Sequence, residues 1–182
     1  MALSFVTDRC IEKIDPGPLQ GWVTIGVATL PIGQTAIVSL HAPTVTKDHE
    51  AFGLRRKTCG TWMMEVAMPY IEDCVARYAN VVIGDDTNCS RHIAQCLNNR
   101  VYREAHECMS AVYGYTEALY ICNNDREMPT WRRSKCTEWT VPNDHLFVRG
   151  PLANPDHLKT SKVMLNPDPP SDHAPVLIIF EF

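Results

Sequence analysis

The stretch VVIGDDTNCS, residues 81 to 90, joins the pattern of a buried β-strand to a cluster of polar side chains. The letters VVI form a short apolar run of the kind that a fully covered strand shows, and Gly84 introduces a turn. Asp85, Asp86 and Asn88 then follow at once. Acids and amides after a strand usually serve a turn or a helix cap. The cluster therefore indicates a functional site only if other strands also end or begin at polar side chains.

Three other apolar segments also begin or end at side chains that can carry chemistry. They are AIVSLHAP (36–43), which contains His41, NDHLFVRG (143–150), which has Asp144 and His145 near its start, and SDHAPVLIIF (171–180), which has Asp172 and His173 near its start. A single histidine at a strand end is more often a surface or hydrogen-bonded residue than a functional one. Strand ends on one rim of a sheet converge in space, so the repetition predicts one shared site for a metal ion and a phosphate.

The length and composition predict a single globular domain over residues 1 to 182. The chain is 45% hydrophobic and 21% charged, which is ordinary for a soluble protein with one core. A net charge of -4 and a pI near 5.9 exclude a global basic field for nucleic acid, although a local basic strip would suffice. No apolar run approaches the roughly 20 residues that span a bilayer, and no secretory signal opens the chain, so we expect neither membrane insertion nor secretion.

The eight cysteines are scattered along the chain and include no CxxC pair. A chain of this size forms a core without disulfides, so reduced thiols in an intracellular protein are the preferred interpretation, with a disulfide framework as the alternative. The His and Cys positions do not have zinc-finger spacing, which argues against a site of that kind.

The chain divides into segments of different periodicity. Residues 1 to 43 are predicted to form strands, because runs such as GWVTIGVATL alternate between apolar and polar positions. Apolar residues recur at helical spacing over residues 47 to 79 and over residues 91 to 112. Pro69 has no backbone donor and must kink or split the first of these helices. Residues 114 to 140 are predicted to be loops, and HLFVRG and PVLIIFEF to be two late strands, so a layered α/β or α+β domain is expected.

The residue types at the predicted rim suit the hydrolysis of a phosphate ester. Hard cations such as Mg²⁺ prefer carboxylate oxygens and keep several waters. An imidazole can donate to a phosphate oxygen, and an aspartate beside it fixes its tautomer. An amide such as that of Asn88 can orient a nucleophile without adding charge. Together these groups favour attack of water on a phosphodiester, with the metal and the donors stabilising the charge of the transition state.

In their order along the chain, SLHAP, IGDDTN, NDHLFVRG and SDHAPV resemble the motifs of the endonuclease/exonuclease/phosphatase superfamily. That superfamily includes DNase I-like nucleases, abasic-site endonucleases, inositol-phosphate 5-phosphatases and deadenylases. The Thr of GDDTN and the segment CTEWTVPNDHLFVRG (136–150) are similar to the branch of the second type of tyrosyl-DNA phosphodiesterase. The resemblance covers about residues 20 to 182 and implies an α+β protein with the DNase I-like two-sheet β-sandwich flanked by helices, a four-layer α/β sandwich.

Carried across position by position, the resemblance implies a catalytic role for five residues. Asp86 would position or activate the attacking water, with Asn88 beside it. His173 would contact the scissile phosphate, and Asp144 would hold the orientation of His173. His41 would be a second donor to the phosphate.

The resemblance also implies Mg²⁺ or Mn²⁺ as the cofactor, bound by Asp172 together with Asp86. Arg55 or Arg56 stands where the family often has an arginine that braces the site, although a solvated helix face explains these residues equally well. The basic and aromatic stretch TWRRSK (130–135) could follow a nucleic-acid backbone or stack on a base, with a solvated loop as the ordinary alternative.

The sequence departs from the family pattern near its N-terminus. The family's domain normally opens with a strand that carries an Asn and a second strand that ends in a metal-binding Glu. Twenty residues precede GWVTIGVATL (21–30), and Glu12 is the sole Glu among them. We therefore expect an N-terminally truncated domain, weak metal binding, and a protein partner that covers the exposed edge of the sheet.

Two functions remain open on the sequence alone. A metal-dependent phosphodiesterase or nuclease that acts on nucleic-acid phosphodiesters would explain the retained site residues. A non-catalytic structural or binding subunit, built on a degenerate or split nuclease fold, would explain the missing metal carboxylate. Coincidental motifs on an ordinary α/β domain are a third interpretation.

Overall fold

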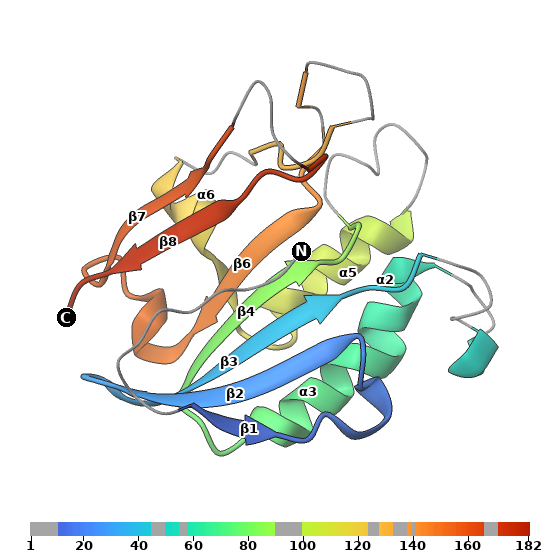
Figure 1. Cartoon of the computed structure of the whole chain (residues 1–182), viewed down its shortest axis with the longest axis horizontal. Helices are drawn as coiled ribbons and strands as arrows, with labels where there is room; N and C mark the ends of the chain where they lie inside the picture. Colours follow the sequence, from blue (N-terminus) through green and yellow to red (C-terminus); the bar gives the residue numbers. More distant parts are fainter. Residues whose placement is uncertain are drawn as a thin grey trace.

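A mixed six-stranded sheet forms the centre of the protein, with the strand order β1-β2-β3-β4-β6-β5 (Figure 1). The computed structural model describes residues 11–44, 50–54, 58–89, 100–123, 128–132, 138–139, 141–165 and 171–182. The strands of the sheet are β1 (Glu12–Ile14), β2 (Val23–Leu30), β3 (Gly33–His41), β4 (Asn80–Asp86), β5 (Thr116–Glu117) and β6 (Asp144–Arg149). Strands β3 and β4 run parallel, and the other neighbours run antiparallel.

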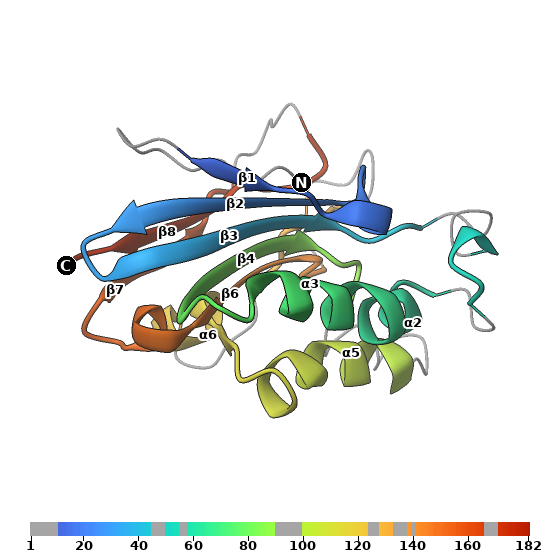
Figure 2. The ribbon, with the colours of Figure 1, turned by 90° about the horizontal axis from the view of Figure 1, so that it is seen from below.

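Helices cover one face of this sheet, as the turned view shows (Figure 2). They are α2 (Cys59–Trp62), the π-helical segment η2 (Met63–Ala67), α3 (Met68–Val75) and α5 (Arg100–Ala111). The predicted break at Pro69 is confirmed, because the π-helical segment ends directly before α3 and Pro69 lies in the first turn of α3. A residue without an N–H is tolerated there, since first-turn donors have no intrahelical partner. The predicted helix over 91–112 is present as α5, and residues 91–99 lie outside the described ranges.

The opposite face of the sheet carries a second, two-stranded antiparallel sheet of β7 (Leu158–Val163) and β8 (Val176–Phe180). The short helix α6 (Ala118–Cys122) packs beside β6 and β7. Short 3-10 turns, η1 (Gly17–Leu19) and η3 (Gly150–Ala153), complete the elements. The predicted α+β class, with two packed sheets and flanking helices, is confirmed. Sequence analysis missed β7, and it assigned the segment that holds β5 and α6 to loops.

The alternation of side chains along β4 divides the core into two parts. Val81 and Ile83 pack on the helix side, in a cluster with residues of α2, α3 and α5. Val82 packs on the other side, in the cluster that faces β7 and β8. Successive side chains of a strand point to opposite faces, so Asp85 continues the helix side and Asp86 continues the sandwich side.

The outer strands of the two sheets differ in how they are covered. Strand β1 pairs with β2 and covers one edge of the large sheet. Strand β8 pairs with β7, and on its other side no strand among the described residues is bonded to it. Ile179 of β8 is 47% exposed and Phe182 is 50% exposed. Apolar residues thus lie beside an unpaired edge.

The helices and the cysteines of the described ranges were the subject of two further predictions, on membrane insertion and on disulfides. None of the helices in the described ranges combines the length and the apolar character that crossing a bilayer requires. The five cysteines in these ranges carry free thiols. Cys10, Cys96 and Cys136 lie outside the described residues.

Candidate functional site

The strand register places three of the predicted residues in one row across the sheet. In the parallel pair β3–β4, His41 lies opposite Asp86, and in the antiparallel pair β4–β6, Asp86 lies opposite Asp144. Directly opposite residues of an antiparallel pair have Cβ atoms about 4.5–5.5 Å apart. Because β3 and β4 are parallel, their C-terminal ends meet at the same rim, and all three side chains point to the sandwich side.

His173 and Asp172 reach this rim from the segment that leads into β8. An isolated β-bridge pairs Trp131 with His173. The backbone N–H of Arg132 donates to the carbonyl oxygen of Asp172 at 3.0 Å. These backbone contacts fix the segment at the rim, so the predicted convergence of strand ends brings His173 to the row.

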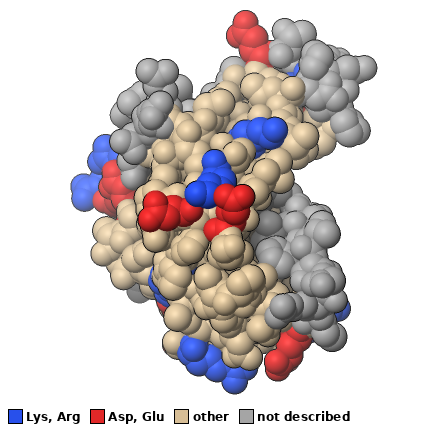
Figure 3. All heavy atoms as spheres, turned by 90° about the vertical axis from the view of Figure 1, so that its left-hand side faces the viewer, with Lys and Arg blue, Asp and Glu red and all other residues tan. Residues whose placement is uncertain are grey.

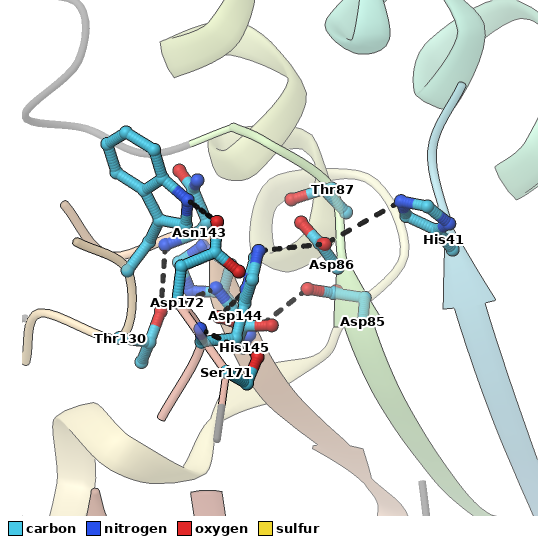
Figure 4. A network of polar contacts seen from close by, with 12 residues as sticks. His41, Asp85, Asp86, Thr87, Thr130, Asn143, Asp144, His145, Ser171 and Asp172 are labelled. Atoms are coloured by element: carbon cyan, nitrogen blue, oxygen red, sulfur yellow. Dashed lines mark hydrogen bonds and ion pairs between the residues drawn. The ribbon is translucent and has the colours of Figure 1, made fainter. Parts of the chain in front are cut away.

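Two imidazoles converge at Asp86, and Figure 4 shows one of them, that of His41, directed towards its carboxylate. Nδ1 of His173 donates to Oδ2 of Asp144 at 2.9 Å, and Nε2 of the same ring lies 3.7 Å from Oδ2 of Asp86. Nε2 of His41 lies 3.7 Å from that same oxygen. The carboxylate of Asp86 is therefore the common point of the row, with Asp144 and His41 on either side of it.

Burial sets the electrostatics of the row. Asp86 is 3% exposed and Asp144 is fully buried. Burial raises the pKa of Asp86, and repulsion from Asp144 raises it further, while His173 and His41 act in the opposite direction. The hydrogen bond to Asp144 raises the pKa of His173, against the effect of its own partial burial. His173 is thus favoured as a charged donor whose Nε2 faces Asp86.

Two residues that sequence analysis did not assign to the site support it from the chain segment beside β6. The hydroxyl oxygen of Thr130, which is fully buried, accepts the backbone N–H groups of Asn143 at 3.0 Å and Asp144 at 2.9 Å. Nε1 of Trp131 donates to Oδ2 of Asp172 at 3.2 Å. The first two residues of TWRRSK thus hold Asp144 and Asp172 in place. Residues 133–135 of that stretch lie outside the described residues, so its predicted contact with nucleic acid stays a prediction.

Asn88 lies at the rim but outside the row that the register forms. It follows β4 by two residues, is half-buried, and has a backbone φ of 53°. This left-handed conformation is one that Asn adopts more readily than most residues. Arg55 and Arg56 lie outside the described residues, so the predicted bracing arginine stays a prediction.

The chemistry of the row fits a divalent cation. Within the described ranges, Asp86, Asp144 and His173 offer three ligand atoms that lie within 4.8 Å of one another. Oδ1 of Asp144 is buried and has no hydrogen-bond partner among the described residues, so it is a suitable oxygen for a cation. Asp172, the predicted partner of Asp86, does not belong to this group, since it is exposed and its carboxylate is bonded to Trp131.

A second polar cluster lies behind the row, on the helix side of the sheet. The register places Asp85 opposite His145. Glu117 of β5 accepts from Nδ1 of His145 at 2.7 Å through Oε1, and its Oε2 lies 2.9 Å from Nε2 of His106 in α5. All four side chains are buried, with none more than 7% exposed. Sequence analysis noted Asp85 and His145 only as neighbours of Asp86 and Asp144, and it missed His106 and Glu117.

His145 is held as an imidazolium by two hydrogen-bond acceptors. Nδ1 faces the carboxylate of Glu117, and Nε2 donates to the carbonyl oxygen of Cys89 at 2.8 Å. Both acceptors lack a proton to give, so both ring nitrogens carry one. Burial alone would lower the pKa of His145, but the charge of Glu117 overrides it and raises that pKa to about 10. Burial alone would raise the pKa of Glu117, but the charge of His145 and the hydrogen bonds from both imidazoles lower it.

The free energy of unfolding is expected to fall as the pH rises above neutrality. The pKa of His145 is about 10 in the fold against about 6.5 in an unfolded chain, so its contribution is complete below pH 6.5 and is lost as the pH rises towards 10. Linkage gives about 1.4 kcal/mol per pH unit, or about 2 kcal/mol between pH 7 and 8.5. Urea denaturation in a chelating buffer measures this slope. His145→Gln should lose the slope, and an identical slope in both proteins would contradict the assignment.

No family model matches the sequence, and no curated protein matches it. Solved structures match it at low identity. D. rerio TDP2 humanized by 14 mutations gives a TM-score of 0.58 at 13% identity, over 96% of this chain and 67% of that chain. The human Nocturnin catalytic domain with bound sulfate gives a TM-score of 0.53 at 15% identity, over 88% of this chain and 52% of that chain. A Bacteroides thetaiotaomicron mannosyl-6-phosphatase gives a TM-score of 0.53 at 16% identity, over 88% of this chain and 57% of that chain.

The chain has the DNase I-like fold. The expected endonuclease/exonuclease/phosphatase architecture is confirmed, and so is the likeness to TDP2. At these identities the likeness establishes the DNase I-like fold alone. The chain spans between 52% and 67% of the length of the three structures.

Proposed function

We propose that this chain is a metal-dependent phosphodiesterase that hydrolyses nucleic-acid phosphodiesters with Mg²⁺ or Mn²⁺. The observation that carries the proposal is the convergence at Asp86, whose Oδ2 lies 3.7 Å from Nε2 of both His41 and His173. Two buried aspartates side by side repel each other, and a fold gains no stability from them unless positive charge is near. Such strained pairs are typical of sites that bind a cation or transfer a proton.

Each residue at the rim can take a separate role in hydrolysis. Asp86 accepts a proton from the attacking water, and Asn88 orients that water from the rim. His173 donates its Nε2–H to a phosphate oxygen, and His41 donates to a second one. Asp144 is a positioning residue, because it holds Nδ1 of His173 at 2.9 Å and so directs Nε2 towards the phosphate.

The carboxylates of the row would hold the metal ion. Asp86 and Asp144 would bind it from the buried side, and Asp172 would approach it from the exposed rim, where Trp131 fixes its carboxylate. When bound, the ion supplies charge neutralisation and polarises the phosphate. With few carboxylates available, the affinity for Mg²⁺ should be low in the absence of substrate.

Nucleic acid is the proposed substrate because an aromatic and cationic surface lies next to Asp172. The guanidinium of Arg132 stacks over the ring of Trp139 at 5.2 Å, beside Trp131. Such groups bind the bases and backbone of single strands. A D. rerio TDP2 structure contains a single-strand DNA product, which supports this choice. On the face drawn in Figure 3, basic side chains are interspersed with acidic ones. The free thiols support an intracellular location.

Removal of the metal tests the proposed function. The purified chain with Mg²⁺ should release an aryl alcohol from single-stranded DNA that carries a 5′ aryl phosphodiester, and EDTA should lower the rate at least about tenfold. A sugar phosphomonoester, assayed in parallel, distinguishes a phosphodiesterase from a phosphatase. Hydrolysis that is unaffected by EDTA would contradict metal dependence, and hydrolysis of the monoester alone would contradict the substrate class.

A second candidate function, a non-catalytic subunit, is favoured by the edge of β8. The apolar strand has no bonded strand opposite β7 among the described residues, and Ile179 is exposed. A partner chain that adds a strand there would cover this edge. A purified chain that is inert with every metal and substrate, but co-purifies with one stoichiometric polypeptide, would favour this function.

A further inference from the structure

The buried cluster on the helix side has the geometry of a metal site that the proposed hydrolysis does not use. Its three ligating side chains come from three elements: His106 from α5, Glu117 from β5 and His145 from β6. One ligand atom of each lies within 4.8 Å of the others. We propose that these three residues bind a zinc ion, which joins α5 to the β5–β6 strand pair behind the candidate active site.

The donor atoms select zinc over the cation proposed for the other side of the sheet. Two imidazole nitrogens and one carboxylate oxygen, with a water as the fourth ligand, form a common tetrahedral zinc set. Mg²⁺ prefers oxygen ligands in an octahedral arrangement and would be a poor fit to His106 and His145. The present distances of 2.7 and 2.9 Å around Glu117 are those of hydrogen bonds, and a zinc ion would spread these atoms by a few tenths of an ångström.

The surroundings of His145 resemble the outer shell of a metal-bound histidine. Its Nε2 donates to the carbonyl oxygen of Cys89, which fixes the ring so that Nδ1 faces His106 and Glu117. A ligating histidine usually makes such a bond with its second nitrogen. The backbone N–H of His145 also donates to Asp85 at 3.2 Å.

A second buried acid, Asp85, stands beside the cluster. It lies opposite His145 in the strand register, is fully buried, and its Oδ2 has no hydrogen-bond partner among the described residues. A dication at the cluster would give this buried acid the counter-charge that its oxygen otherwise lacks.

A cavity beside the cluster offers space for the fourth ligand. Its volume is about 220 Å³, and His106, Glu117, Ser110 and Tyr120 are among its lining residues. A water needs roughly 10–15 Å³ of such a cavity and polar neighbours, both of which the cavity provides. On binding, Zn²⁺ takes the place of two protons that face Glu117. The proton on Nδ1 of His145 passes to solvent, and the proton on Nε2 of His106 moves to Nδ1 of the same ring by exchange with solvent.

Zinc retention and cobalt spectroscopy test this site. The metal-free chain, mixed with one equivalent of Zn²⁺ and desalted, should retain about one ion per chain by mass spectrometry of the metal. Co²⁺ in place of Zn²⁺ should give the visible absorption of a tetrahedral site without near-ultraviolet thiolate charge-transfer bands, which distinguishes this cluster from cysteines. A wild-type chain that retains no zinc, or that shows no tetrahedral cobalt absorption, overturns the proposal without any variant.

Variants assign the ion to the cluster. His106→Gln and Glu117→Gln should each weaken zinc binding at least about 100-fold, more than loss of an outer-shell partner does. His157→Ala is the matched control, because His157 precedes β7 at the far end from the rim and should leave retention unchanged. His173→Ala should also retain zinc, since it alters the other side of the sheet. Loss of zinc in His173→Ala with retention in His106→Gln would assign the ion to Asp86 and overturn the proposal.

Discussion

Replacement of His173 by alanine is expected to lower the rate of metal-dependent phosphodiester hydrolysis about 1,000-fold, with little change in the unfolding transition. The substitution removes the donor that faces Asp86, and loss of one such donor to a developing negative charge costs about 10²–10³ in rate. The side chain of His173 is 24% exposed, so its removal leaves no closed cavity. Single-turnover kinetics with saturating Mg²⁺ measure the effect on the chemical step.

Two companion variants separate a catalytic histidine from a merely structural one. His157→Ala removes an imidazole that contacts the carbonyl oxygen of Glu181, near the far end of β8, and should leave the rate unchanged. Asp144→Asn keeps the shape of the positioning residue but removes the charge that raises the pKa of His173. This variant should lower the rate and move the alkaline limb of the pH–rate profile to lower pH, because His173 then loses its proton more readily. Equal activity of His173→Ala and wild type would remove His173 from the site.

Replacement of Glu117 by alanine is expected to destabilise the metal-free protein by about 3–5 kcal/mol. Glu117 is the acceptor for Nδ1 of His145 and lies 2.9 Å from Nε2 of His106. Its removal leaves a buried imidazolium without its counter-charge, which is the costly way to break a buried ion pair. Urea denaturation in the presence of a chelator measures the free energy of unfolding without any contribution from bound metal.

The chain offers a matched control for this measurement. Glu104 on α5 forms an exposed ion pair with Arg100, so Glu104→Ala should cost less than about 1 kcal/mol. Glu117→Gln, which keeps an acceptor oxygen, should fall between the two alanine variants, because His145 can then lose its proton. If Glu117→Ala costs no more than Glu104→Ala, the buried ion pair contributes little to the fold.

The site row could be predicted from sequence because it lies on strands with strong local patterns. Asp86 and Asp144 each adjoin an apolar run whose strand character is plain, and His173 precedes another. Convergence of strand ends then follows from the geometry of a sheet. The pairing of His41 with Asp86 required a parallel neighbour, and the helix between β3 and β4 supplies the crossover that makes those strands parallel.

The remainder of the site depends on contacts that no local pattern encodes. Thr130 and Trp131 act on Asp144 and Asp172 from segments that are distant in sequence. His106 and Glu117 lie in a helix and a two-residue strand, and only the packing of α5 against β5 and β6 brings them to His145. The sequence does not predict strand β7, because LKTSKV has an irregular burial pattern with a bulge after its first residue.

The geometry adds a candidate to the metal ligands that the resemblance implies. The resemblance pairs Asp86 with Asp172, which stays a prediction, and the described structure also groups Asp86 with Asp144 and His173. The reason is the register of β4 and β6, which makes Asp86 and Asp144 direct neighbours. Asp172 lies on a connecting segment, whose position no strand pattern defines.

The alternation along β4 has a consequence for how this gene can change. Asp85 and Asp86 are adjacent codons, yet one faces His145 under the helices and the other faces Asp144 between the sheets. A one-codon insertion or deletion within β4 would exchange the two acids and spoil both chemistries at once. Related genes should therefore keep the length of this strand, while length differences accumulate in the connections outside it.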